Sequence, residues 1–159
     1  MNIREVEQAD LEQLLTLYTQ LHGNDMPEFD GKLEPLWNSI LSDQNHHIVV
    51  GLADGRIVSS CVIVIVPNLT RNQRPYALIE NVITHEAHRG QGYATQILDH
   101  ARQIAERENC YKIMLLTGSK QESTIRFYER AGFNRNDKTG FIQWLSSSLS
   151  SGIDTSSPK

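Results

Sequence analysis

The strongest chemical signal in the sequence is a glycine-rich turn between a predicted strand and a predicted long helix. The segment runs from Thr84 to Ala94 and holds Gly90, Gly92 and the small Ala94 within five residues. Glycine lets the backbone approach a ligand closely, and several N–H groups can then point into one concavity. The following helix adds free N–H groups and the positive end of its dipole. We therefore expect a phosphate or pyrophosphate to bind at this turn.

Arg89 precedes Gly90 at the start of the helix. A basic side chain is unfavourable against the positive end of a helix dipole unless an anion lies between them, so Arg89 favours phosphate binding. The alternative is a tight strand-to-helix connection in which glycine serves only the turn geometry. The turn lacks the Gly-Lys-Ser/Thr ending of a P-loop and the G-x-G-x-x-G pattern of a nicotinamide site.

Two ordered motifs give the chain a family resemblance. Arg89-x-x-Gly92-x-Ala94 resembles the R/Q-x-x-G-x-G/A motif of the GNAT N-acetyltransferase superfamily, which binds the pyrophosphate of coenzyme A. Phe127-Tyr128, followed by Gly132-Phe133, resembles the second signature of that family. The resemblance covers roughly residues 2–145, and its motifs lie between residues 76 and 133. Segments 78–83 and 109–113 are also similar to glucosamine-6-phosphate N-acetyltransferases.

The resemblance implies acetyl-CoA as the co-substrate, held between two splayed strands at residues 76–84 and 111–117. It implies backbone contacts from the first strand and N–H contacts from the glycine turn to the pyrophosphate. Gln121 stands where many members carry Asn, so this position departs from the family pattern. The implied cofactor-binding residues are Val82, Ile83, Thr84, Arg89, Gly90, Gln91, Gly92, Tyr93, Ala94 and Gln121.

Tyr128 is the candidate catalytic acid. Acetyl transfer from a thioester to an amine requires an amine without its extra proton, a donor for the oxyanion and a proton for the departing thiolate. A thiol pKa near ~8.5 and a phenol pKa near ~10 are close enough for proton transfer between them. The alternative is a core tyrosine on an amphipathic helix. By the resemblance, the backbone N–H of Val82 is the oxyanion donor.

Glu80 is the candidate general base. In an undistorted strand it shares a face with Leu78, Val82 and Thr84, which would put an ionisable group on a mostly apolar face. Burial would raise its pKa and make it a better base, directly or through water. The alternative is a partly exposed glutamate, or one paired with an arginine such as Arg74.

The histidines and cysteines have weaker claims to function. His85 and His88 flank the glycine turn and could act as bases or phosphate contacts, although loop histidines more often face solvent. His46 and His47 are adjacent and point to opposite faces of a strand, so they cannot chelate one metal. No zinc-like spacing occurs, and we expect no metal. The two cysteines, Cys61 and Cys110, fit core positions better than a nucleophile's.

The elements that must position these residues follow from periodicity and turn residues. Asp54-Gly55 between two β-rich runs predicts a hairpin. Asp10 with Gln13 is typical of a capping box before the first helix. The predicted strands are 2–6, 46–53, 56–66, 76–84, 111–117 and 141–145, and the predicted helices begin near residues 11, 33, 94 and 122. This order predicts a single α/β (α+β) GNAT-like domain with a mixed, mostly antiparallel sheet flanked by helices and splayed at two central strands.

Length and charge limit the number of domains and the partners. The chain has 159 residues, which suits one domain at 1–145 followed by a Ser-rich tail at 146–159 that we expect to be disordered. A net charge of −4 gives no reason to expect nucleic acid or an anionic membrane as a partner. No segment resembles a signal peptide or a membrane span, so we expect a cytoplasmic protein. The resemblance leaves a homodimer as an option.

The sequence therefore predicts an acetyl-CoA-dependent N-acetyltransferase that acts on a primary amine of a small metabolite in a ternary complex. Glucosamine 6-phosphate is an alternative acceptor, for which Arg71, Arg74 and Lys120 could supply phosphate-binding cations. A protein N-terminus or lysine is another alternative. From a different class, the domain could be an acyl-CoA-binding sensor without turnover. The long loop 67–75 is expected to reach the acceptor site or a partner subunit.

Overall fold

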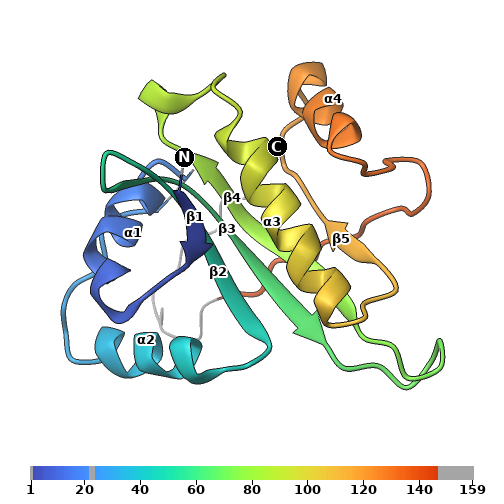
Figure 1. Ribbon diagram of the computed structural model, residues 1–159, viewed down its shortest axis with the longest axis horizontal. Helices are drawn as coiled ribbons and strands as arrows, with labels where there is room; N and C mark the ends of the chain where they lie inside the picture. Colours follow the sequence, from blue (N-terminus) through green and yellow to red (C-terminus); the bar gives the residue numbers. More distant parts are fainter. Residues whose placement is uncertain (1, 22–23, 147–159) are drawn as a thin grey trace.

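A computed structural model describes residues 2–21 and 24–146 (Figure 1). Its five strands form one sheet in the order β1-β2-β3-β4-β5, with antiparallel neighbours except for the parallel pair β4–β5. This confirms the predicted mixed, mostly antiparallel sheet. The strands are β1 (Asn2–Glu5), β2 (His46–Ala53), β3 (Arg56–Val66), β4 (Tyr76–Thr84) and β5 (Ile113–Leu115). The helices are α1 (Leu11–Tyr18), α2 (Leu33–Ser42), α3 (Tyr93–Arg107) and α4 (Glu122–Arg130), with single 3-10 turns at η1 (Gln8–Asp10) and η2 (Glu86–His88).

The predicted hairpin joins β2 to β3 through a two-residue turn. Asp54 and Gly55 both have positive φ, at 47° and 75°. This backbone twist matches that of two antiparallel strands, and Asp and Gly are among the residues that tolerate it best. The turn sets the pairs Ala53–Arg56 and Leu52–Ile57, and an irregularity between Gly51 and Leu52 shifts the register of the remaining pairs by one residue.

Two apolar cores cover the two faces of the sheet. Alternate residues of each strand point to opposite faces, so each core collects one set. The α3 face contains Val49, Cys61, Ile63, Ile65, Ala77, Ile79, Ile97, Leu98, Ala101, Ile104 and Ala105, and α4 packs at its margin through Phe127 and Tyr128. The face covered by α1 and α2 contains Leu14, Leu17, Trp37, Ile48, Val50, Ile57, Val62 and Ile83. Figure 1 shows α3 lying across one face of the sheet.

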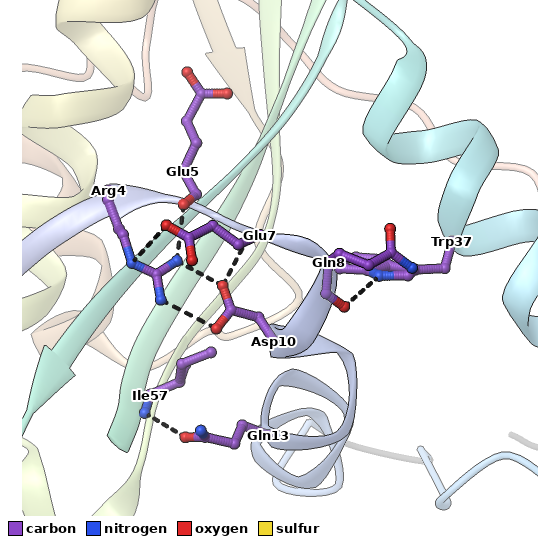
Figure 2. A network of polar contacts seen from close by, with 8 residues as sticks. All are labelled: Arg4, Glu5, Glu7, Gln8, Asp10, Gln13, Trp37 and Ile57. Atoms are coloured by element: carbon purple, nitrogen blue, oxygen red, sulfur yellow. Dashed lines mark hydrogen bonds and ion pairs between the residues drawn. The ribbon is translucent and has the colours of Figure 1, made fainter. Parts of the chain in front are cut away.

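A polar network ties α1 and α2 to the sheet (Figure 2). The Arg4 guanidinium donates to both oxygens of buried Asp10, at 2.5 and 3.1 Å, and lowers the pKa of that carboxyl. The Asp10 carboxylate also accepts from the Glu7 N–H at 2.7 Å. The Trp37 indole N–H of α2 donates to the Gln8 carbonyl at 3.1 Å. Both helices are therefore anchored to the end of β1.

The predicted Asp10–Gln13 capping box is wrong. The 3-10 turn η1 precedes α1, and Asp10 belongs to that turn, so its carboxylate serves Arg4 and Glu7 and makes no side-chain cap for α1. Gln13 instead accepts the backbone N–H of Ile57 at 3.1 Å through its side-chain oxygen.

The C-terminal part of the chain also differs from the prediction. Residues 141–145 form no strand, and four of their large apolar side chains are exposed. A strand exists only with a hydrogen-bonding neighbour, and this segment pairs with no strand in the described chain. β5 is three residues long where seven were predicted. Ser146 is described without regular structure, and the rest of the predicted tail, 147–159, lies outside the described residues.

Candidate active site

A β-bulge distorts the second half of β4. Ser60 and Val62 of β3 pair with Ile83 and Glu80, so Asn81 and Val82 together oppose the single residue Cys61. Asn81 adopts φ of +50°, a left-handed conformation that Asn tolerates better than most residues. A bulge leaves its extra residue outside the ladder. It therefore places an N–H of the Asn81–Val82 pair where it can donate to a ligand.

The bulge also sends neighbouring side chains to opposite faces of the sheet. Glu80 pairs with Val62, which belongs to the α1/α2 face. Val82 packs with the α3-face core, whereas Ile83 lies in the α1/α2-face core. The expectation that Glu80 and Val82 share a face is therefore wrong, because the extra residue shifts the alternation by one position.

β5 pairs with only the first half of β4. The ladder joins Ala77, Leu78 and Ile79 to Ile113, Met114 and Leu115, and β5 ends there. From Glu80 to Thr84, β4 has no strand neighbour on its β5 side among the described residues. Figure 1 shows β4 and the chain that follows β5 diverging from this point. The predicted splay thus coincides with the bulge.

The glycine turn joins the end of β4 to α3. Gly90 and Gly92 have φ of +73° and +81°, which favours glycine at both positions. Gly92 is the N-cap of α3, no described side chain caps the helix, and its first turn carries no acidic residue. A Cβ atom on Gly90 would meet nothing within 4 Å. The glycines therefore leave open space beside uncapped N–H groups, as an anion site requires.

Other side chains of the turn hold it in shape. The Arg89 Nε–H donates to the Thr84 carbonyl at 3.2 Å, and the Gln91 amide donates to the Ala87 carbonyl at 3.3 Å. Tyr93 lies edge-on to His88 with ring centroids 5.8 Å apart. Arg89 remains exposed, so its guanidinium is anchored at Nε and open to solvent. This geometry is compatible with a cation next to a bound phosphate.

Tyr128 approaches the bulge from the α3 face. It is half-buried on α4 beside Phe127 and Phe133, with ring centroids 5.0 and 6.2 Å away. It packs on the core cluster that also contacts Val82 and contains Cys61. Burial, and secondarily Cys61, raises the pKa of the Tyr128 phenol, so the hydroxyl is protonated at neutral pH but its pKa lies further from that of a thiol than the ordinary values suggest. A protonated phenol is the form that a general acid needs.

Glu80 reaches the bulge from the opposite face and is exposed. The expected burial is wrong, and so is the part of the argument for a base that rested on burial. The first predicted alternative, a glutamate at least partly exposed, agrees with the structure. The second, a pairing with Arg74, is not observed, since Arg74 donates to the Asn109 and Cys110 carbonyls at 3.2 and 3.0 Å. Tyr128 and Glu80 therefore flank the bulge from the two sides of the sheet.

Gln121 lies at the N-cap of α4, close after the C-terminal end of β5. Its side chain is exposed and makes no cap hydrogen bond. The C-terminal ends of two parallel strands lie at the same end of a sheet, so Gln121 lies at the same end of the sheet as the glycine turn. The structure thus gathers three segments around that end of the sheet: Val82–Thr84, Arg89–Ala94 and Gln121–Tyr128.

The loop 67–75 lies at the other end of the sheet. It enters β4 at Tyr76, the end opposite the glycine turn. Arg71 lies over the Tyr111 ring at 5.6 Å, and Lys112 lies over the Tyr76 and Tyr111 rings at 5.2 and 5.3 Å. In its own chain the loop, with Arg71 and Arg74, therefore lies at the end of β4 away from the glycine turn, and its contact with the acceptor site or with a partner subunit stays a prediction. Lys120, exposed just before α4, remains available.

The remaining reactive residue types fit structural roles. Burial raises the pKa of the Cys61 thiol to about 12, which keeps it protonated and unreactive, and Cys110 is also a free thiol. His85 accepts the Ala87 N–H as the cap of η2 at 3.2 Å. Within the part of the chain that the structure describes, no three His, Cys, Asp or Glu residues are grouped to hold a metal ion. No described helix has the length and apolarity needed to cross a membrane.

Two residues of the site are missed by prediction from the sequence. Asn81 forms the bulge, and an Asn inside a β-rich run is a signal for such a distortion, since strands disfavour it and it tolerates positive φ. Buried Ser59 fixes the end of β4 by donating to the Ile83 carbonyl at 3.1 Å and by bonding Thr84 Oγ1 at 2.8 Å. Nothing local in the sequence indicates the role of Ser59.

The fold and the site together define an α/β domain that can hold a phosphate-bearing ligand at the diverging ends of two parallel strands. The chain matches the Acetyltransferase (GNAT) family over residues 9–133, and it belongs to that family.

Relatives agree with this assignment. Over 84 residues the chain is 32% identical to the glucosamine 6-phosphate N-acetyltransferase of Trypanosoma brucei brucei, a match that spans 53% of this chain and 55% of the relative's length. A solved structure from Agrobacterium tumefaciens str. C58, assigned to the acetyltransferases, is 40% identical, with a TM-score of 0.85 over 91% of this chain and 100% of the other. The fold is also that of glucosamine-6-phosphate N-acetyltransferase from Arabidopsis thaliana, at 21% identity, a TM-score of 0.81, and coverage of 91% and 98%.

Proposed function

We propose that the protein transfers the acetyl group of acetyl-CoA to a primary amine of a small metabolite by direct attack in a ternary complex. The observation that carries the proposal is the coincidence of three features at one place. These are the bulge at Asn81–Val82, the end of β4–β5 pairing after Ile79, and the uncapped glycine turn that follows Thr84. Membership of the GNAT family supports acetyl-CoA as the ligand.

The chain has a group for each step of the transfer. Acetyl-CoA supplies the activated acyl group as a thioester. The bulge N–H, assigned to Val82, donates to the carbonyl oxygen as the amine nitrogen forms its bond to the carbonyl carbon. Glu80 accepts the proton that the amine loses, directly or through water. As the carbon–sulfur bond breaks, Tyr128 donates its phenolic proton to the departing sulfur.

The two faces of the sheet have separate tasks in this proposal. The glycine turn is followed by α3, and Tyr128 and Val82 lie on the α3 face, so acetyl-CoA would bind from that side. Glu80 lies on the α1/α2 face, from which the amine would approach. Val82, Ile83, Thr84, Arg89 to Ala94 and Gln121 are the proposed cofactor contacts.

Glucosamine 6-phosphate is the second candidate acceptor, because the relative from Trypanosoma brucei brucei bears that activity in its name. Its phosphate needs a cation, and the exposed Lys120, just before α4, is a candidate on this chain. A cytoplasmic location and a homodimer are further parts of the proposal that rest on the sequence.

The test measures release of the CoA thiol from acetyl-CoA with a panel of amines that includes glucosamine 6-phosphate. Tyr128→Phe and Glu80→Gln are expected to slow turnover while leaving equilibrium binding of CoA within about twofold, since neither residue is proposed to contribute much ground-state binding. The matched controls are Tyr111→Phe, at the far end of the sheet, and Glu34→Gln, in the first turn of α2. Both controls should keep wild-type turnover.

CoA binding without turnover on any amine would instead support the acyl-CoA sensor. Turnover with a peptide amine alone would replace the small-metabolite acceptor by a protein acceptor. Unchanged turnover in Tyr128→Phe would remove Tyr128 from the mechanism.

A further inference from the structure

A cluster of cations and tyrosines lies at the end of the sheet where β4 and β5 begin. The guanidinium carbon of Arg71 lies 5.6 Å from the centroid of the Tyr111 ring. The Lys112 ammonium lies over both the Tyr76 and the Tyr111 ring, at 5.2 and 5.3 Å, and the two rings meet edge to face at 6.3 Å. We call these four residues the basic cluster. It lies at the end of β4 opposite the glycine turn, and the proposed transfer mechanism does not use it.

A disfavoured backbone turn places Arg71 in the basic cluster. Arg71, Asn72 and Gln73 have φ of 55°, 58° and 58°, three consecutive left-handed residues of which none is glycine. Such a run persists only where surrounding contacts fix it. Here the Asn68 side-chain amide donates to carbonyl oxygens on both sides of the turn, at 3.0 and 3.1 Å. Figure 1 shows this loop between β3 and β4 extending beyond the sheet. Backbone strain of this kind gathers at functional sites.

The charges of the basic cluster have no carboxylate partner. Neither Arg71 nor Lys112 forms a salt bridge in the part of the chain that the structure describes. The adjacent Arg74 donates to two backbone carbonyls instead of a carboxylate. Glu108, at the C-cap of α3, pairs with none of the three. Although the whole chain has a net charge of −4, this end of the sheet therefore presents a positive local field.

The composition and rigidity of the basic cluster are those of a binding surface. Tyrosine and arginine are enriched in the centres of protein interfaces and among the residues that contribute most to binding. Arg71 is exposed, and Lys112 and both tyrosines are half-buried. Because each cation already rests on a ring face, it has less side-chain freedom to lose when a partner binds.

The tyrosine rings favour an acidic peptide over a free phosphate. A phosphate is held by donors that converge on its oxygens, and it has no apolar group to place against a ring. A glutamate side chain has methylene groups that can pack on the rings while its carboxylate pairs with a cation. The two charges lie within 5.6 Å of one ring centroid, so they are at most about 11 Å apart. Alternate side chains on one face of an extended peptide are roughly 6.5 Å apart, so one segment can reach both cations.

We propose that the basic cluster docks an extended acidic segment of a partner protein. Two carboxylates of that segment pair with Arg71 and Lys112, and their methylene groups pack on the Tyr76 and Tyr111 rings. Charge complementarity of this kind determines which partner binds and in which register. The inference does not depend on the acceptor or on acetyl transfer.

The experiment titrates the isotope-labelled full chain with a short capped peptide that alternates Glu and Ala, and follows the backbone amide signals by NMR at low salt. We expect saturable shifts concentrated in residues 71–74 and 111–112, and none there with the matching peptide of Lys and Ala. Roughly 0.5 M salt should abolish the shifts by screening. The double variant Arg71→Gln/Lys112→Gln should weaken peptide binding at least about tenfold, since both charge pairs are lost. Arg71→Gln alone, at an exposed position, should weaken it severalfold and serves if the double variant does not fold.

The matched control is Arg56→Gln/Arg130→Gln, which removes two other exposed arginines, changes the net charge by the same amount and should bind the peptide as the wild type does. Absence of saturable shifts overturns the proposal. Equal weakening in the two double variants also overturns it, because the attraction would then come from net charge alone. Inorganic phosphate that shifts the same amides at lower concentration than the peptide would replace the acidic segment by a phosphate ligand. Shifts that follow protein concentration alone would place a second copy of the chain on this surface instead.

Discussion

The two halves of β4 have opposite properties although they belong to one nine-residue strand. The first half, Tyr76 to Ile79, is paired on both sides, with β3 and with β5. Arg74 and the stacked Lys112 and tyrosine rings tie its entry to the start of β5. The second half, Glu80 to Thr84, is bulged, is paired on one side and continues into the glycine turn.

The second half also has buried polar groups with no partner. The hydroxyls of Tyr18 on α1 and Ser60 on β3 are buried beside the second half of β4. Neither meets strict hydrogen-bond geometry, although Ser60 lies close enough to Tyr18 to lower its phenol pKa against the larger effect of burial. Unsatisfied buried groups cost free energy, and proteins carry such costs mainly at functional sites. His47 Nε2, beside the first half, is also buried without a partner, so the contrast rests on strand pairing: the first half is paired on both sides, and the second half has backbone groups that are free to contact a ligand.

The largest expected effect contrasts tyrosines at the two ends of the parallel strand pair. Tyr128→Phe should lower kcat by about 10²-fold, at the lower end of what a positioned proton donor contributes, with CoA binding unchanged. Tyr111→Phe changes the same chemical group at the first-half end and should alter kcat less than twofold. Steady-state kinetics with the best amine measures both. Equal losses in the two variants would mean that the ends do not differ in function.

The next effect contrasts two glycines with the same backbone conformation. Gly92 and Gly31 have φ of +81° and +80°, so alanine costs about 1 kcal/mol of stability at either site. Only Gly92→Ala places a methyl group in the turn, and it should weaken CoA binding about tenfold, because the backbone must approach the phosphate closely. Isothermal titration with CoA and urea unfolding separate the two effects. Similar CoA affinity in both variants would contradict the assignment of the turn.

A third prediction concerns the pH dependence of stability near the bulge. Burial raises the pKa of Tyr18 to about 12, whereas an unfolded tyrosine has a pKa near ~10. Between these values the unfolded chain loses the proton and the folded chain keeps it, so stability is present below pH ~10 and falls as pH rises, by about 1 kcal/mol at pH ~11. Tyr18→Phe should reduce this alkaline loss. Urea unfolding at pH 8 and at the alkaline pH compares the variant with the wild type, and equal losses would contradict the prediction.

Most of the sheet could be predicted from local sequence signals. The Asp54-Gly55 turn fixes the hairpin, and the apolar spacing from Ala94 to Ala105 identifies α3. The glycine turn was located correctly because positive φ demands glycine at Gly90 and Gly92. These features depend on residues close together in the sequence.

The bulge and the C-terminal segment could not be predicted in the same way. A strand pattern assumes strict alternation, so it placed Glu80 and Val82 on one face, and only the pairing with β3 shows the extra residue at Asn81. The apolar run 141–145 looks like a strand, but strand formation depends on a neighbour far away in the chain or in another chain. Both errors arise where the structure depends on partners that the local sequence does not name.

The smallest expected effects contrast two adjacent serines on β3, both with 0% exposure. Ser59 donates to the Ile83 carbonyl and bonds Thr84, so Ser59→Ala should destabilise the fold by about 1 kcal/mol and leave the Thr84 hydroxyl without its partner. The Ser60 hydroxyl meets no strict hydrogen-bond geometry, with the Tyr18 hydroxyl as a polar neighbour, so Ser60→Ala should be neutral or stabilising by up to about 1 kcal/mol. Urea unfolding of the two variants side by side measures the sign of each change. The same chemical deletion therefore has different expected effects at neighbouring positions, because Ser59 Oγ makes two hydrogen bonds and Ser60 Oγ makes none of good geometry. Equal destabilisation by both substitutions would show that the Ser60 hydroxyl makes a hydrogen bond in the folded protein. The free-energy cost of buried unpaired groups beside the second half of β4 would then be smaller than proposed.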